Sequence, residues 1–355
     1  MTERNKTIDI CKFFAMVFII LAHVLQRTLP NFNQSFVGTF LIILGLPIFF
    51  FFSGISTSYR KPLKPLGFLY DILKRALNYM WPVVFFLVLR VAFYNQWPDV
   101  PKAFEVFWDI PVMGMWFLWV LLWINIASDI GLLVATFFPK YKKICVFFLI
   151  CMSYALLVIL RQRGIIYSNT FIGYDYFMAY TPIFLFGYLF GDKLFKYINI
   201  YVSSIAFIIG LTLTILIVHY SEQMVVIDLP TNIPLFYISS LFGFLTMYGL
   251  STLIERLKFS KIIAFMGKFT LEAYFLHLML IKNWGAFGFT DNWLITGYTI
   301  GLFLLLFINT VGVVAISYYI PFAHFLLFGR SWSFYKFEKN IVNKIKDIAY
   351  KYQFY

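Results

Sequence analysis

Charged side chains are scarce in this chain, since Asp, Glu, Lys and Arg make up only 13% of its 355 residues. In soluble globular domains, charged residues make up about 25% of the sequence, which keeps the surface polar. Hydrophobic residues instead reach 61%. The shortage of charge excludes a soluble globular protein. It predicts an all-α, polytopic membrane protein.

Acidic residues are scarcer than basic ones, with 16 Asp and Glu against 29 Lys and Arg and a net charge of +13. In a soluble protein such an excess would suggest a nucleic-acid partner. In a membrane protein it is expected, because Lys and Arg collect in cytoplasmic loops. We therefore predict membrane lipid, and no nucleic acid, as a partner.

Cysteine and histidine are also rare. The three cysteines, Cys11, Cys145 and Cys151, lie in or beside apolar runs, so the sequence implies no disulfide framework. The sequence contains no His-Glu-x-x-His motif, paired-cysteine zinc pattern, phosphate-binding Gly-rich loop or Gly-x-Ser-x-Gly elbow. We predict no metal site and no tightly bound cofactor.

Long apolar runs are what the sequence has in abundance. Ten of them are about long enough to cross a hydrocarbon core of roughly 30 Å. With a cytoplasmic N-terminus, the inner segments hold 22 Lys and Arg and the outer segments hold six, which predicts that both termini are cytoplasmic. The expected spans are 8–27, 36–57, 76–97, 113–137, 144–161, 174–192, 199–219, 233–254, 262–283 and 293–320.

The chain divides into two expected regions. Residues 1–329 would form the transmembrane domain, and residues 330–355 a basic cytoplasmic tail. Apolar residues recur every fourth position in this tail, which favours an amphipathic helix on the anionic inner leaflet. The alternative is a disordered basic tail.

The first span carries three ionisable residues, Asp9, Lys12 and His23. Such residues are costly at mid-bilayer and usually face a protein interior or a water-filled cavity. Lys12 and His23 are eleven residues apart, which places them near one helix face at a separation of roughly 16 Å. This pattern is typical of the wall of a polar passage. The alternative is a lysine that extends to the headgroups and a histidine hydrogen-bonded within the bundle.

Other polar residues accompany these three. Glu272 and His277 lie five residues apart in the ninth span, too far around the helix for one clean face. A basic cluster lies at the inner ends of the first three spans and consists of Arg60, Lys61, Lys64, Lys74 and Arg75. Such a cluster either binds a phosphorylated cytoplasmic donor or only fixes the topology.

Three stretches resemble the integral-membrane acyltransferase type 3 family, which O-acylates cell-envelope sugars. TIDICKFFAMVFIILAH is similar to its opening pattern of Asp, a basic residue, ten residues and His, here Asp9, Lys12 and His23. LPIFFFFSGIS resembles an aromatic-rich second helix that ends in Ser53 and Gly54. MGKFTLEAYFLH resembles a late signature, here Gly267, Thr270, Glu272, Tyr274 and His277.

One position departs from the family's pattern. The family often has two arginines three residues apart at the start of the third helix. Arg75 fits the first of them, but Asn78 stands at the second. If both arginines hold the donor, this change bears on the affinity for the donor or on its choice.

The resemblance implies that acyl-coenzyme A, with acetyl as the expected acyl group, is the donor substrate. Its phosphates would bind the basic cluster of Arg60, Lys74 and Arg75, with Lys12 also holding donor charge. His23 would act as general base on a sugar hydroxyl or carry the acyl group itself, and Asp9 would pair with a cation. Further candidate site residues are Ser53, Asn78, Glu272, Tyr274 and His277.

We therefore expect an enzyme of the bacterial cytoplasmic membrane. It would O-acylate a cell-envelope polysaccharide or its lipid-linked precursor. A multi-pass transporter is one alternative, and it would show internal symmetry between its halves. A non-catalytic partner in polysaccharide export is another, and it would not need Lys12 and His23 on one face.

Overall fold

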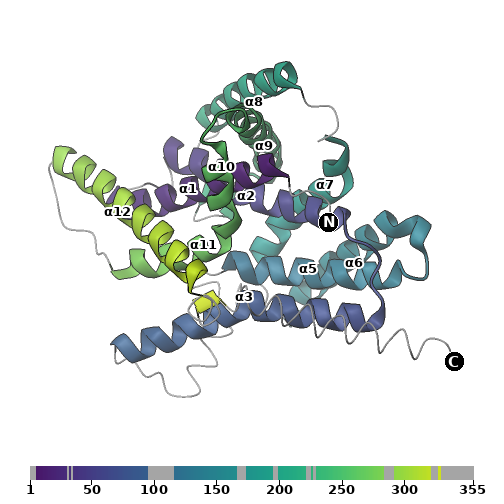
Figure 1. Cartoon of the computed structure of the whole chain (residues 1–355). Helices are drawn as coiled ribbons and strands as arrows, with labels where there is room; N and C mark the ends of the chain where they lie inside the picture. The colour runs from purple at the N-terminus through teal and green to yellow at the C-terminus, as the bar shows by residue number, and fades with distance from the viewer. Residues whose placement is uncertain are drawn as a thin grey trace.

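The fold is a bundle of helices, shown in Figure 1. A computed structural model describes residues 5–29, 32, 35–94, 116–165, 173–194, 199–220, 225–226, 229–283, 292–320 and 327–328. The helices are α1 (Lys6–Thr28), α2 (Phe36–Ser58), α3 (Pro65–Tyr94), α5 (Trp116–Val134), η3 (Pro139–Tyr141), α6 (Lys142–Gln162), α7 (Tyr174–Leu194), α8 (Ile200–Tyr220), α9 (Ile233–Glu255), α10 (Ser260–Met266), η4 (Gly267–Phe269), α11 (Thr270–Asn283) and α12 (Asn292–Tyr319). Two short strands, β1 (Val225–Val226) and β2 (Leu229–Pro230), pair antiparallel.

The helical fold class is confirmed, as is the expectation of several membrane spans. Seven described segments are long and apolar enough to cross a membrane: Lys6–Gln26, Phe36–Ser58, Trp116–Val134, Pro139–Gln162, Ile200–Tyr220, Ile233–Glu255 and Thr296–Ile316. The other three expected spans overlap α3, α7 and the α10–η4–α11 segment. The total of ten spans and the cytoplasmic termini stay predictions, and the tail 330–355 lies outside the described residues.

Polar residues cap the N-terminal ends of several helices. Asn5 caps α1 by accepting a hydrogen bond from the backbone N–H of Ile8, and Ser35 caps α2 by accepting one from Gly38. These side chains satisfy N–H groups that have no carbonyl partner in the first helical turn. The polar residues between the apolar runs therefore help to set where these spans begin.

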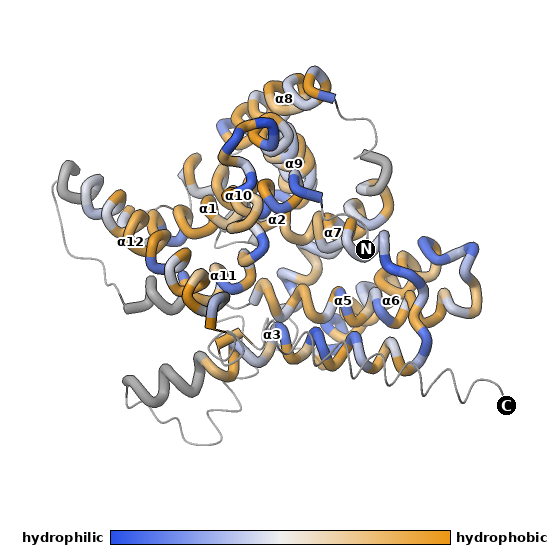
Figure 2. The backbone as a smooth tube through the Cα atoms, viewed as in Figure 1, coloured by the Kyte–Doolittle hydropathy of each residue, from blue (hydrophilic) through white to orange (hydrophobic). Residues whose placement is uncertain are grey.

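The third expected span begins earlier than the apolar run predicts, at Pro65 rather than residue 76. The added turns carry Asp71, Lys74 and Arg75, and Figure 2 shows blue, hydrophilic residues alternating with orange ones in this first half of α3. Apolar run length cannot detect these turns because they are amphipathic. They bring charged side chains into contact with the ends of α2 and α5.

The ninth expected span, 262–283, is not one continuous α-helix. It is divided into α10, η4 and α11, with the break at Gly267. A Cβ atom at Gly267 would overlap the carbonyl oxygen of Asp9 on α1, so only glycine allows the two backbones to approach so closely. The break therefore follows from tertiary packing that the apolar pattern does not reveal.

Helix α2 lies at the centre of the bundle and packs closely against α7. A Cβ atom at Gly54 would overlap the Phe184 carbonyl, and one at Gly187 would overlap the Phe51 carbonyl. Small residues of this kind allow close helix packing in membranes. Aromatic rings also pack in the core, as where Phe50 stacks on Tyr180 with ring centroids 4.7 Å apart.

The start of α1 is fixed against α9 and α10. The Lys6 ammonium donates to the Glu255 carbonyl at 3.1 Å and to the Ser260 hydroxyl at 2.8 Å. The Thr7 hydroxyl donates to the Glu255 carboxylate. In Figure 1, α1 lies beside α2, α10 and α12. These contacts fix the position of α1, and with it Lys12 and His23, along the axis of the bundle.

Candidate functional site

A cavity of about 330 Å³ opens among α1, α2, α3, α5 and the η4–α11 segment. None of the described residues that line the cavity is acidic. Four of these residues are basic, namely Lys12, Arg60, Arg75 and Lys268. Its other polar lining residues include Ser53, Ser56, Thr57, Tyr79, Asn125, Thr270 and Tyr274. The cavity brings together residues from the first, second and third stretches singled out in the sequence.

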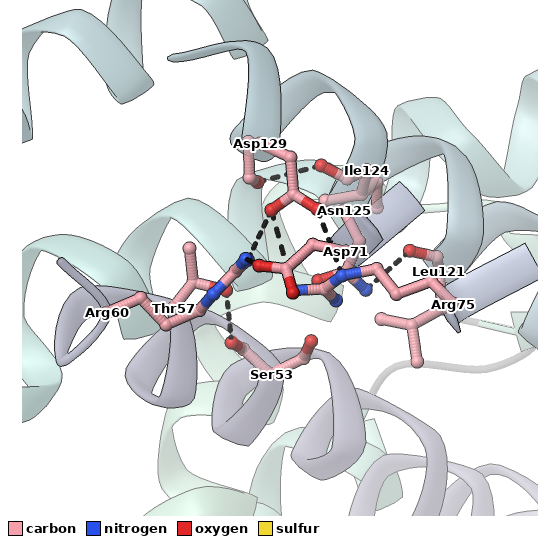
Figure 3. Close-up of polar contacts among 10 residues, drawn as sticks. Ser53, Thr57, Arg60, Asp71, Arg75, Leu121, Ile124, Asn125 and Asp129 are labelled. Atoms are coloured by element: carbon pink, nitrogen blue, oxygen red, sulfur yellow. Dashed lines mark hydrogen bonds and ion pairs between the residues drawn. The ribbon is translucent and has the colours of Figure 1, made fainter. Parts of the chain in front are cut away.

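Two arginines and two aspartates form an ion-pair network on one side of this cavity, shown in Figure 3. Arg60, just after α2, binds Asp129 through Nη1 and Asp71 through Nη2, the latter at 2.5 Å. Arg75 binds the same Asp129 through Nε at 3.0 Å. A buried carboxylate thus joins guanidinium groups from two chain segments, and charge-assisted pairs of this kind fix geometry well.

Asn125 adds a neutral polar group to the cavity wall. Its side-chain amide donates to the Leu121 carbonyl at 2.7 Å, and its Oδ1 atom is buried with no hydrogen-bond partner among the described residues. A buried acceptor without a partner is costly unless a ligand or water satisfies it. This oxygen is suited to accept a hydrogen bond from an amide or hydroxyl of a bound molecule.

A row of rings leads from the cavity to His23. Tyr274 lines the cavity, and its ring lies edge-on to His277 with centroids 5.5 Å apart. His277 in turn stacks on His23, with centroids 5.3 Å apart. His23 itself lines a separate small cavity with Gln26 and Phe32. Tyr274 and His277 thus lead from the cavity that Lys12 lines to the second cavity, which His23 lines.

The hydrogen bonds of both histidines assign their tautomers. Nδ1 of His277 lies 3.1 Å from the Ala273 carbonyl oxygen, which only accepts, so this nitrogen carries the proton. Nδ1 of His23 lies 3.3 Å from Gln26 Oε1, which also accepts. In the neutral form of each ring, Nε2 then holds the lone pair, the arrangement that a general base or nucleophile needs. Nε2 of His277 is buried and makes no hydrogen bond in the described part of the chain.

Four other residues that the sequence analysis named as candidates are not among the residues that line the cavity. Asp9 is buried where α1 meets Gly267, and Glu272 is buried on α11. Lys74 lies over the ring of Tyr70, and Asn78 is half-buried and does not line the cavity. Among the residues described, no group of three His, Cys, Asp or Glu side chains is placed to hold a metal ion.

Sequence reasoning assigned no role to Asp71, Asp129, Asn125 or Lys268. Asp129 had a usable signal, since an acidic residue within an apolar run is rare and usually functional. Lys268 lies within the MGKFTLEAYFLH stretch, whereas Asp71 had no signal because it lies in a segment rich in other charges. Asn125 is a polar residue within an apolar run, but the sequence does not show which face of α5 borders the cavity.

One of three comparisons with known proteins finds a match. A family model described as "Acyltransferase domain" matches residues 5–320, which is most of the chain. Comparisons with curated proteins and with solved structures find no match. The match includes the segments that carry the basic cavity, the ion-pair network and the stacked histidines.

Proposed function

Since the chain belongs to the acyltransferase 3 family, we propose that it is a membrane O-acyltransferase using cytoplasmic acyl-coenzyme A. The acyl group in this proposal is acetyl. The acceptor is a hydroxyl of a cell-envelope polysaccharide or of its lipid-linked precursor. The protein would act as a multi-pass enzyme in the cytoplasmic membrane of a bacterium.

The basic cavity supports the donor side of this proposal. Lys12, Arg60 and Arg75 supply positive charge at the end of the bundle that holds the N-terminus of α1, which is the end we expect to face the cytoplasm. Phosphate groups are bound by arginine in bidentate fashion and by lysine as a point charge. Coenzyme A carries such phosphates at one end and its thioester at the other. The thioester would reach past Asn125 and Tyr274 toward the histidines.

The chemical step needs one base and one leaving group. The acceptor hydroxyl oxygen attacks the thioester carbonyl carbon, and Nε2 of His23 takes the hydroxyl proton. The C–S bond then breaks, the ester forms, and the coenzyme A thiolate leaves and is protonated. A positioned general base of this kind accelerates a reaction by about 10²–10⁴-fold. Gln26 supports the role by holding the proton of His23 on Nδ1.

The observation that carries this proposal is the row from the basic cavity through Tyr274 and His277 to His23. The experiment compares envelope glycans by mass spectrometry from cells with and without the gene. Loss of an acetyl mass from one glycan in the deletion strain, restored by the gene but not by its His23→Ala form, supports the enzyme. A smaller amount of the glycan at the envelope, with its degree of acetylation unchanged, would instead support transport or an export partner.

A further inference from the structure

We infer that the two carboxylates bound to Arg60 have opposite effects on donor binding. Asp129 is a positioning residue that holds Arg60 and Arg75 at the cavity, whereas Asp71 is a counterion that a donor phosphate replaces. This inference rests on the proposed function, in which the phosphates of acyl-coenzyme A bind in the basic cavity. It concerns two acidic residues, one on α3 and one on α5.

Asp129 is enclosed by its partners. Its side chain is 0% exposed, and it binds Arg60 through Oδ1 and Arg75 through Oδ2. Arg75 also reaches Oδ1 through Nη2 at 3.5 Å, so its guanidinium lies side-on to the carboxylate. Removing this carboxylate would leave Arg75 without a carboxylate partner among the described residues and Arg60 with Asp71 alone, which is unfavourable. Asp129 therefore keeps both contacts when the donor binds, and it fixes the direction of both guanidinium groups.

Asp71 is held differently. Its side chain is 28% exposed, and its Oδ2 atom lies 2.5 Å from Nη2 of Arg60. Partly exposed ion pairs add little stability, because water replaces the partner at small cost. A carboxylate oxygen and a phosphate oxygen are equivalent acceptors for a guanidinium N–H. Asp71 thus occupies the place on Arg60 that the donor phosphate takes.

The Nη1 group of Arg75 can bind a further anion. Its Nε and Nη2 atoms are used on Asp129, and its Nη1 atom contacts no carboxylate among the residues that the structure describes. Arg60 and Arg75 both line the cavity, Arg60 from just after α2 and Arg75 from α3. Once Asp71 leaves Arg60, one N–H group from each arginine is available to the same anion, held in place from behind by Asp129. This arrangement suits a diphosphate.

The test uses the full-length protein purified in detergent and measures the dissociation constant for acetyl-coenzyme A by calorimetry at constant ionic strength. We expect Asp129→Asn to raise the constant by about tenfold or more, because Arg60 and Arg75 lose the carboxylate that orients both of them. We expect Asp71→Asn to lower it by about three- to fivefold, because a competing ion pair is gone. Inorganic pyrophosphate should also compete more strongly in Asp71→Asn. Asp175→Asn on α7, away from the cavity, is the matched control and should leave the constant unchanged.

The two aspartate variants make the same chemical change beside the same arginine, so a merely structural ion pair would shift both constants in one direction. Such parallel shifts, or an unchanged constant in Asp71→Asn, would overturn the inference. If Asp129→Asn does not purify as a single species, Asp129→Glu replaces it, and a raised constant is again expected. Failure of the unmodified chain to bind acetyl-coenzyme A would overturn the proposed function itself. Binding with parallel shifts would overturn only the inference.

Discussion

The imidazole rings of His23 and His277 stack with their centroids 5.3 Å and their planes 30° apart. They come from α1 and α11, which are more than 250 residues apart in the chain. His277 is fully buried and hydrogen-bonded through Nδ1 to its own helix, so it forms a fixed surface for the ring of His23. A catalytic group gains much of its effect from being held in one orientation.

Replacing His277 by alanine should therefore lower kcat on the order of 10²-fold, as misplaced catalytic groups do. The KM for acetyl-coenzyme A should change little, because His277 does not line the basic cavity. Steady-state kinetics of the purified protein measure both constants. His219→Ala, an exposed histidine on α8, is the matched control. Full kcat in His277→Ala, or an equal loss in His219→Ala, would contradict the positioning role.

The Tyr274 ring is expected to matter for packing. Its centroid lies 5.2 Å from that of Phe117 and 5.5 Å from that of His277, and the residue is buried. Tyr274→Ala removes both ring contacts, and losses of about 3–5 kcal/mol are typical for buried aromatic residues. Tyr274→Phe keeps the ring. The melting temperature should fall clearly in the alanine variant and only slightly in the phenylalanine variant. Equal falls would show that the hydroxyl, not the ring, carries the stability.

The break at Gly267 gives a prediction about backbone packing. An alanine Cβ there would overlap the Asp9 carbonyl, so Gly267→Ala should push α1 away from η4 and lower both melting temperature and activity. Gly301→Ala on α12 is the control, because a Cβ there meets nothing within 4 Å. The control should be neutral or stabilise by about 0.5–1 kcal/mol, as alanine is favoured over glycine within helices. Similar melting temperatures for the two variants would argue against the close contact.

Arg75→Lys tests the side-on pair with Asp129. Lysine keeps the charge but cannot offer Nε and Nη2 together to one carboxylate. We expect the KM for acetyl-coenzyme A to rise by about tenfold, the effect of losing roughly 1.4 kcal/mol, while kcat is largely kept. Arg161→Lys, which changes an arginine over the Tyr174 ring outside the cavity, should leave both constants unchanged. An unchanged KM in Arg75→Lys would remove Arg75 from the donor site.

Much of this architecture could be predicted from sequence because membrane spans have a strong compositional signal. The ionisable residues of the first span also pointed to the site, since buried charge is rare unless it is used or paired. Lys12, Arg60, Arg75, Ser53 and Tyr274 do line one cavity. Their chemical roles stay predictions.

Other features depend on contacts between distant segments. The stack of His23 on His277 joins α1 to α11, and the helical periodicity of the sequence does not predict this contact. The same is true of Gly267, whose importance appears only when the Asp9 carbonyl is placed beside it. Arg60 was grouped with nearby basic residues because the sequence could not show that it shares Asp129 with Arg75.

The central claim is that His23 takes the proton of the acceptor hydroxyl during acyl transfer. The most direct measurement supplies acetyl-coenzyme A, labelled in its acetyl group, to membranes that contain the protein and its native glycan, and follows label into the glycan fraction. We predict transfer by the unmodified chain, a loss of about 10²–10⁴-fold in His23→Ala at equal protein level, and no loss in His219→Ala. Transfer by His23→Ala at the unmodified rate would contradict it.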